Sequence, residues 1–271
     1  MFPTVPFPPL PEWLPIAAED RPAALRVFGS DMRDLAVEFA NVERPRLVTN
    51  LLACCSQTSS GSPTPEHAIW ELSLGTRIAA IVALAAGSER PLSWRVRCGY
   101  ADCGEEGALE LTPAEIAAVA AEAHREKLVP VKIGSRTAWL RRPTGADQRR
   151  WLESGTAPIP ASLFVDPAFE DLDAEGIAPD EIGDSIDRAM EESDPLVDFH
   201  LDVGCAECGR PTPHAPDLLA AALERLWLAQ FDLIGQVHRL ASHYHWTEEE
   251  ICKVPGWRRQ AYLACIDGGE L

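Results

Sequence analysis

The clearest pattern of hydrophobic positions in the chain lies between residues 217 and 244. Positions there recur at spacings of three and four, which aligns them on one face of a long helix: Leu219, Leu223, Leu226, Gln230, Leu233, Val237, Leu240 and Tyr244. Trp227, Phe231 and Ile234 form a second apolar stripe beside the first. A helix with so wide an apolar surface is expected to pack into a core and not to form an isolated coiled coil. His238, beside that stripe, is expected to be a hydrogen-bonded core histidine and not a metal ligand.

Two shorter helices are predicted after the long one. Thr247 and Glu250 have the spacing of a capping box, and Pro255 ends the helix that they begin. A last helix follows, with Arg258 and Arg259 expected on its outer face. The three helices together predict a C-terminal helical bundle.

The first twenty residues differ from the rest because six of the first fifteen are proline. Proline at this density excludes helix and central strand, and it predicts an extended arm. The aromatic residues Phe2, Phe7 and Trp13 are expected to lie across either the chain's own domain or a neighbouring subunit. The neighbouring subunit is slightly favoured.

The rest of the N-terminal third predicts a mainly helical region. The expected elements are a short strand, a helix capped by Ser30 and Asp31, a second helix and a buried apolar helix, at residues 25–28, 30–39, 45–55 and 78–85. The middle of the chain mixes strands with helices. Its expected strands are residues 94–97, 108–111, 129–133, 137–140 and 197–203, and its expected helices are residues 112–124 and 147–151.

Two cysteine pairs fall where strands are expected to reverse. Cys98 and Cys103 follow one strand, and Cys205 and Cys208 follow another. Hairpin tips that each offer two thiolates are typical of a zinc ribbon, and four sulfurs about 2.3 Å from Zn²⁺ leave no position for water or substrate. Glycine after each pair permits the tight turn around the metal. About a hundred residues separate the pairs, so a shared zinc site is a hypothesis; the alternative is two sets of reduced, unliganded cysteines.

These patterns predict an α+β fold: a helical body, a small antiparallel zinc-ribbon β element and a C-terminal helical bundle. The predicted parts are a Pro-rich extended arm at 1–20, an N-terminal helical region at 21–90, a zinc-ribbon β region with inserted helices and an acidic segment at 91–216, and the bundle at 217–271.

Composition narrows the class of protein. The 271 residues are 46% hydrophobic, which can supply the core of one large domain or two small ones. No secretory leader and no apolar run of roughly 18 residues is found, so we expect a soluble protein in a reducing compartment. Eight cysteines there favour metal or free thiols over disulfides. Cys54, Cys55, Cys252 and Cys265 are expected to be buried small hydrophobic residues.

The formal net charge of −18 argues against nucleic-acid binding, because phosphate contacts require a basic face. Fourteen acids against Arg188 as the single base lie between residues 166 and 202. Residues 171–176 match the first half of a calcium-binding loop, but Pro179 and Ile182 occupy ligand positions nine and twelve. We therefore expect a solvated acidic helix with a flexible lead-in, whose face could dock on a basic partner.

Motifs of catalysis are missing from the sequence. There is no phosphate-cradling glycine loop, dinucleotide fingerprint, nucleophile elbow or metalloprotease histidine pair. Four thiolates would also leave the metal no open position. The chain is therefore expected not to be an enzyme, with no catalytic or cofactor-binding residue assigned. A hydrolase that uses carboxylates of the acidic segment is the enzymatic alternative.

Four stretches of the chain carry a further signal. They are residues 70–77 before an apolar helix, the first cysteine pair with Gly104 and Glu105, residues 140–147, and the C-terminal segments 237–241, 244–251 and 258–263. These stretches resemble the baseplate (hub assembly) protein family of contractile-tailed phages and related contractile injection systems. Its members look like zinc-ribbon proteins with two C-x2-C knuckles, so the resemblance implies metal binding by Cys98, Cys103, Cys205 and Cys208. The first knuckle departs from that pattern, being longer and lacking the usual proline.

The resemblance implies a non-enzymatic structural or assembly component of a baseplate, stabilised by a structural Zn²⁺. The implied partners are other baseplate, hub or tube proteins in a hetero-oligomeric assembly, with no small-molecule substrate. The implied location is the cytoplasm of a bacterial host or a phage tail-like particle. The competing interpretation is a zinc-ribbon adaptor or regulator acting on a nucleic-acid machine, which the acidic charge disfavours.

Overall fold

A computed structural model describes residues 4–87, 91–123, 126–154, 161–169, 171 and 177–268. Helices and small antiparallel sheets alternate along these residues, which confirms the predicted α+β class. The elements, with two 3-10 turns at Ala18–Asp20 and Ala161–Leu163, are β1 (Thr4–Pro6), β2 (Pro22–Arg26), α1 (Met32–Leu35), α2 (Arg44–Cys55), β3 (Ser56–Thr58), α3 (Glu66–Trp70), α4 (Leu74–Ala86), β4 (Leu92–Arg97), β5 (Glu106–Leu111), α5 (Pro113–Ala123), β6 (Leu128–Ile133), β7 (Arg136–Arg141), α6 (Gly145–Ser154), β8 (Phe164–Asp166), α8 (Pro179–Ser193), β9 (Leu201–Gly204), β10 (Pro211–His214), α9 (Leu218–Tyr244), α10 (Glu248–Lys253) and α11 (Gly256–Ile266).

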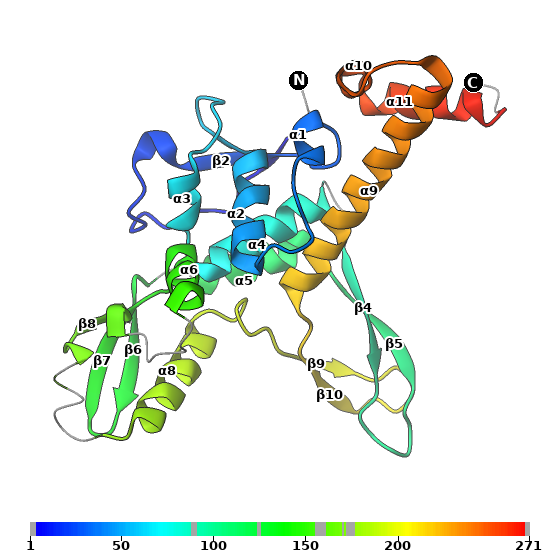
Figure 1. The fold of residues 1–271 in the computed structure, drawn as a ribbon. Coiled ribbons are helices and arrows are strands. Elements are labelled where there is room, and N and C mark those ends of the chain that lie inside the picture. The colour runs from blue at the N-terminus through cyan, green and yellow to red at the C-terminus, as the bar shows by residue number, and fades with distance from the viewer. Residues whose placement is uncertain are drawn as a thin grey trace.

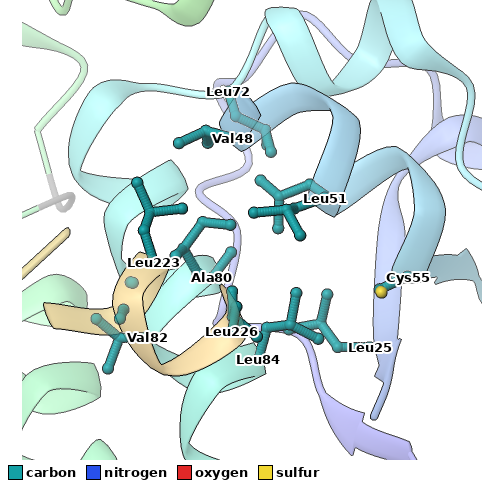
Figure 2. Packing of buried hydrophobic residues seen from close by; sticks show 14 of the residues in the cluster. Leu25, Val48, Leu51, Cys55, Leu72, Ala80, Val82, Leu84, Leu223 and Leu226 are labelled. Atoms are coloured by element: carbon teal, nitrogen blue, oxygen red, sulfur yellow. The ribbon is translucent and has the colours of Figure 1, made fainter. Parts of the chain in front are cut away.

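The largest hydrophobic core surrounds α4, and we call this part of the molecule the body (Figure 1). α4 begins at Ser73, whose hydroxyl oxygen accepts a hydrogen bond from the backbone N–H of Thr76. The apolar residues that follow are buried on most sides by α2, α5 and the first half of α9. Figure 2 shows Leu51, Ala80 and Leu226 converging from α2, α4 and α9. The buried helix predicted near residues 78–85 is therefore the centre of the body.

The proline-rich arm lies on this body. Its strand β1 is the edge of a three-stranded antiparallel sheet in the order β1-β2-β3, and Phe7 and Leu14 are buried in the core. An edge position suits β1, because proline has no backbone N–H to donate to a second neighbouring strand. The favoured expectation, that the arm crosses a neighbouring subunit, is wrong for Phe7 and Leu14, which pack on the chain's own core. Phe2 lies outside the described residues.

The helix expected over residues 30–39 is only α1, four residues long. The predicted Asp31 cap is confirmed, and Asp34 completes a capping box. The helix ends early because Gln230 of α9 donates hydrogen bonds from Nε2 to the backbone carbonyls of Asp34 and Val37, at 2.6 and 2.7 Å. This pairing also explains why a glutamine stands in the apolar face of α9.

A second core forms a small lobe from β6, β7, β8 and α8 (Figure 1). β6 and β7 are the predicted hairpin, and Gly134 in its turn has a φ of 57°. α8 packs on this sheet through Ile182 and Ile186, while its acidic side chains face solvent. The acidic helix is thus amphipathic and not solvated all round. Residues 170 and 172–176, with the expected lead-in and most of the rejected calcium loop, lie outside the described residues.

The body and the small lobe meet where residues 70–77 cross residues 140–147, two of the stretches noted in the sequence. The backbone N–H of Leu74 donates to the carbonyl of Pro143 at 3.2 Å, and that of Gly145 donates to the carbonyl of Leu72 at 3.1 Å. The guanidinium of Arg77 occupies the space that a Cβ at Gly145 would need. Glycine therefore permits the close crossing of these two segments.

Buried charges reinforce this junction. Arg142 donates hydrogen bonds to the backbone carbonyls of residues 123, 126 and 193, so it joins the ends of α5 and α8. The carboxylate of Asp147 is buried and accepts from the Arg141 guanidinium at 2.7 and 2.8 Å. Burial raises the pKa of Asp147, but hydrogen bonds from Arg141 and from the Thr144 backbone outweigh this effect and lower the pKa to about 2.

The second half of α9 carries a third, smaller core with α10 and α11 (Figure 1). Thr247 and Glu250 form the predicted capping box at the start of α10. Arg258 is exposed as expected, but Arg259 is buried and donates hydrogen bonds to the carbonyls of Ser30 and Val254. α11 is thereby tied to the loop before α1. Within the described ranges, no helix combines the length and the apolarity that crossing a bilayer requires.

The second apolar stripe of α9 is not part of any core. Trp227, Phe231 and Ile234 are exposed, and so is His238. The expectation that this stripe packs inside the protein, with His238 as a core residue, is therefore wrong. The body and the third core cover only the first face of the helix, which leaves the stripe without an internal partner among the described residues.

Candidate metal centre

Two hairpins leave the body near the start of α9, and we call them together the hairpin arm (Figure 1). In the first, residues 92–97 of β4 pair antiparallel with residues 106–111 of β5. In the second, residues 201–204 of β9 pair antiparallel with residues 211–214 of β10. The tips of the two hairpins carry the four cysteines that the sequence singled out.

Each tip is a tight turn with the same backbone design. The first cysteine of each tip donates its backbone N–H to the carbonyl of the residue just before the returning strand: Cys98 donates to Glu105 at 2.9 Å, and Cys205 donates to Arg210 at 3.0 Å. The glycine after the second cysteine has positive φ, 63° at Gly104 and 69° at Gly209. Glycine adopts this region without steric cost, so the expectation of a turn-permitting glycine is confirmed at both tips.

The two tips bring four sulfur atoms together. The Sγ–Sγ distance is 3.8 Å from Cys98 to Cys208 and 3.7 Å from Cys103 to Cys205, and all four sulfurs lie within 4.8 Å of one another. A tetrahedral ion about 2.3 Å from each sulfur would hold them about 3.8 Å apart. A disulfide would need an S–S distance of about 2.05 Å. The expected meeting of the two pairs is therefore confirmed, and the four residues could bind a metal ion.

Arg210 connects the two tips beside the sulfurs. Its Nε donates a hydrogen bond to Cys208 Sγ at 3.4 Å, and its Nη2 donates to Asp102 Oδ1 at 2.6 Å. Its guanidinium carbon also lies 3.9 Å from the ring centroid of Tyr100. Asp102 and Tyr100 belong to the first tip and Arg210 to the second. Sequence reasoning missed this contact, because nothing in the local pattern marks a pair 108 residues apart.

The thiols differ in their pKa values. Hydrogen bonds from the Arg210 side chain and backbone lower the pKa of Cys208 to about 6. A backbone hydrogen bond at Glu105 lowers the pKa of Cys103, but burial and hydrogen bonds with the other three thiols outweigh it and raise that pKa to about 12. Four thiolates this close repel one another, so binding of a cation would be coupled to loss of the remaining protons.

Apart from the backbone pairing within each hairpin, few side-chain contacts hold the outer part of the hairpin arm together. Among residues 95–108 and 201–214, only Cys98 and Thr212 are buried, and none of the three hydrophobic cores extends into these segments. Thr212 Oγ1 accepts a hydrogen bond from the backbone N–H of Gly99 at 3.3 Å, which links the two hairpins once more. A closed four-thiolate site would fix the shape of such an arm and would leave no position for a substrate.

The other four cysteines only partly match expectation. Cys55 and Cys252 are buried, whereas Cys54 is partly exposed and Cys265 is exposed. Cys54 and Cys55 also lie within 4.8 Å of a carboxylate oxygen of Asp34. Both oxygens of Asp34 already accept hydrogen bonds from Arg26, at 2.6 and 3.0 Å. This second group is therefore a buried ion pair with thiol neighbours, and Arg26 supplies the positive charge that a metal would otherwise bring.

Comparison with known proteins adds no relative: no family model, curated protein or solved structure matches the chain. Fold and site together define an α+β protein with a four-cysteine cluster that could bind a metal.

Proposed function

We propose that the chain is a non-enzymatic structural or assembly component of a contractile-tail or injection-system baseplate. In this proposal a Zn²⁺ ion bound by Cys98, Cys103, Cys205 and Cys208 fixes the hairpin arm. The observation that carries the structural role is the convergence of four sulfurs at hairpin tips that lie outside all three hydrophobic cores. The baseplate assignment rests on the four stretches that resemble that family.

The ligand set favours zinc. Four thiolates in tetrahedral arrangement are typical of structural Zn²⁺ or of iron–sulfur chemistry. Two of the six Sγ–Sγ distances, 3.7 and 3.8 Å, match the edge of a tetrahedron around one ion, and the other four lie within 4.8 Å. A single redox-inert ion would supply a permanent crosslink, and Arg210 would offset part of the negative charge of four thiolates.

The positions of the resembling stretches support a scaffolding role. Residues 70–77 and 140–147 cross at the junction of body and small lobe. The C-terminal segments supply most of the third core, including Val237, Leu240 and Leu263. These stretches therefore lie where the fold must be held in shape, as expected for a part that works inside a larger assembly. The proposed partners are other baseplate, hub or tube proteins, in the bacterial cytoplasm or in the particle.

Metal analysis tests the zinc part. The purified chain is expected to contain about one zinc per molecule by elemental analysis. Cys205→Ser is expected to lose metal and solubility, whereas Cys265→Ser is the matched control because Cys265 is exposed and outside the cluster. A parent protein without transition metal, together with a normally soluble Cys205→Ser variant, would overturn the zinc assignment.

Particle assembly tests the baseplate part. In the cell that encodes the chain, its deletion is expected to abolish contractile particles with complete baseplates in electron micrographs. The parent chain and Cys265→Ser are expected to restore them, and Cys205→Ser is not. Intact particles without the chain would contradict the baseplate role, and salt-sensitive binding to nucleic acid would favour the adaptor interpretation instead.

A further inference from the structure

Four large apolar side chains are exposed together on two successive turns of α9. Trp227, Leu228, Phe231 and Ile234 expose between 46 and 63% of their surface, and we call them the α9 patch. The rings of Trp227 and Phe231 already contact each other, with centroids 5.8 Å apart. Four of the eleven exposed large hydrophobic residues among those described thus lie within eight positions of one helix. Exposed apolar surface gathered in this way marks an interaction site.

The α9 patch has the geometry of one half of a helix–helix contact. Trp227, Phe231 and Ile234 are spaced by four and three residues, so they form a ridge along the helix axis. Gly235 lies beside that ridge, and a Cβ there would meet no atom within 4 Å. Because Gly235 carries no side chain and lies one turn from Phe231, a partner helix can approach the backbone of α9 closely there.

The charges around the α9 patch decide between possible partners. Glu224 and Asp232 lie exposed on the same turns, and Asp232 accepts a hydrogen bond from the Gln236 side chain at 2.8 Å. Arg225, the cation on these turns, is half-buried and donates a hydrogen bond to the carbonyl of Pro91 at 2.6 Å. Arg239, one turn beyond the patch, is already paired with Asp267. The fully exposed charges on these turns are therefore acidic, as is the whole chain at a formal charge of −18. A second copy of the chain or an anionic membrane surface would be repelled, and a basic partner would be attracted.

We propose that the α9 patch binds a basic amphipathic helix of another protein, with apolar side chains on Trp227 and Phe231 and with Lys or Arg opposite Glu224 and Asp232. Aromatic side chains at the centre of an interface contribute much of its binding energy, and the flanking charges increase the association rate and the selectivity for a partner. The α9 patch lies on a different element from the hairpin arm, so this interaction does not depend on metal binding or on the baseplate assignment.

Synthetic peptides of defined pattern test this proposal. The probe is a fluorescent 20-residue helix with Leu and Trp on one face and Lys on its flanks. One comparison peptide has Glu in place of Lys, and another has the Lys peptide's composition in scrambled order, without an apolar face. Fluorescence anisotropy is expected to show the patterned Lys peptide binding at least tenfold more tightly than either comparison peptide. Binding is expected to weaken as salt is raised.

Variants of the chain locate the binding. Phe231→Ser is expected to weaken binding of the Lys peptide about tenfold or more. Val165→Ser is the matched control, because Val165 is a similarly exposed apolar residue on the small lobe, and it is expected to change nothing. If Phe231→Ser fails to fold, Asp232→Lys provides the same test through the rim charge, since its side chain is exposed and packs in no core.

Several results would overturn the proposal. These are equal binding of the patterned and scrambled Lys peptides, and binding that survives both Phe231→Ser and Asp232→Lys. Sedimentation that shows a dimer of the parent, lost in Phe231→Ser, would assign the α9 patch to a second copy of the chain. Co-sedimentation with phosphatidylcholine vesicles, lost in the same variant, would assign it to a lipid surface.

Discussion

The hairpin arm and the body are held together by different physical means. In the body, stabilisation comes from many apolar side chains, such as Leu51 and Leu226, each of which contributes a few kcal/mol by leaving water. In the outer part of the hairpin arm, residues 95–108 and 201–214, only Cys98 and Thr212 are buried, so side-chain cohesion there is concentrated in four sulfurs and the contacts of Arg210. A distributed core weakens by degrees when one residue changes, whereas a single crosslink is either present or absent.

Removal of the metal is expected to give the largest loss of stability, and only in the hairpin arm. If the hairpin arm stayed folded without metal, the contrast between it and the body would not hold. Binding free energies of structural zinc are about 10–16 kcal/mol, and here they would act on the hairpin arm alone. After chelation, hydrogen exchange measured by mass spectrometry is expected to lose protection at residues 95–108 and 201–214. Protection in α4 and α9 is expected to stay unchanged. Equal protection of the hairpin arm with and without chelator would show that backbone pairing alone suffices.

Truncation of a buried leucine in α9 is expected to give the second-largest loss of stability, and only in the body. Leu226→Ala removes a side chain that is 1% exposed, which is expected to cost about 2–5 kcal/mol of unfolding free energy. Leu228→Ala, two positions away and 52% exposed, is the matched control, with an expected change below about 0.5 kcal/mol. Urea unfolding measures both. Metal content should be the same in the two variants, and its loss in Leu226→Ala would show that body and hairpin arm are not independent.

The junction between body and small lobe adds a third kind of link, a buried charge that responds to pH. The pKa of Asp147 is about 2 in the folded chain and 3.8 in its ordinary state. The folded pKa is the lower one, so this carboxylate stabilises the fold fully above about pH 4, and that contribution, about 2 kcal/mol, is lost as pH falls toward 2.

Unfolding free energies across pH check this expectation. The difference between the parent and Asp147→Asn should be largest near neutral pH and should shrink below about pH 4. A difference that is constant with pH would mean that Asp147 acts through its shape and not through its charge. This measurement separates the charged junction from both the apolar body and the hairpin arm.

The smallest effect is expected from substitution of Arg210, and it tests whether this side chain supports metal binding by the hairpin arm. Arg210→Ala removes a hydrogen bond to Cys208 and the link to Asp102, and groups that orient metal ligands typically affect affinity by at least about tenfold. Competition with a chromophoric chelator measures this loss. Arg95→Ala, an exposed change on β4 outside the cysteine tips, is the control. Equal affinities for both variants would reduce Arg210 to a surface contact.

Local patterns predicted the local structure well. Spacing identified α9, capping residues identified the starts of α1 and α10, and a glycine after each cysteine pair matched the turns at positive φ. The four cysteines could be singled out because thiolates in hairpin tips have a recognised chemical use. Their convergence required the structure, since no local pattern fixes the distance between segments a hundred residues apart.

The failures share one cause, which is that periodicity does not say what covers a face. Trp227 and Phe231 have the spacing of core residues but are exposed, because the cores on either side of α9 cover only its other face. Gln230 shortens α1 from 193 residues or more away in sequence. Arg259 is buried although its neighbours are charged or polar, because the carbonyl of Ser30 reaches it from a distant loop. In each case a contact between distant segments overrode the local preference.

The continuity of α9 has a mechanical consequence. The helix runs for 27 residues, about 40 Å at 1.5 Å per residue, and residues 215–217 alone join it to the second hairpin. A tilt of about 5° at that end would sweep the opposite end through about 3–4 Å. The position of α10 and α11 is therefore set by how firmly the first half of α9 is packed in the body, because the helix converts a small rotation there into a displacement of several ångströms at its far end.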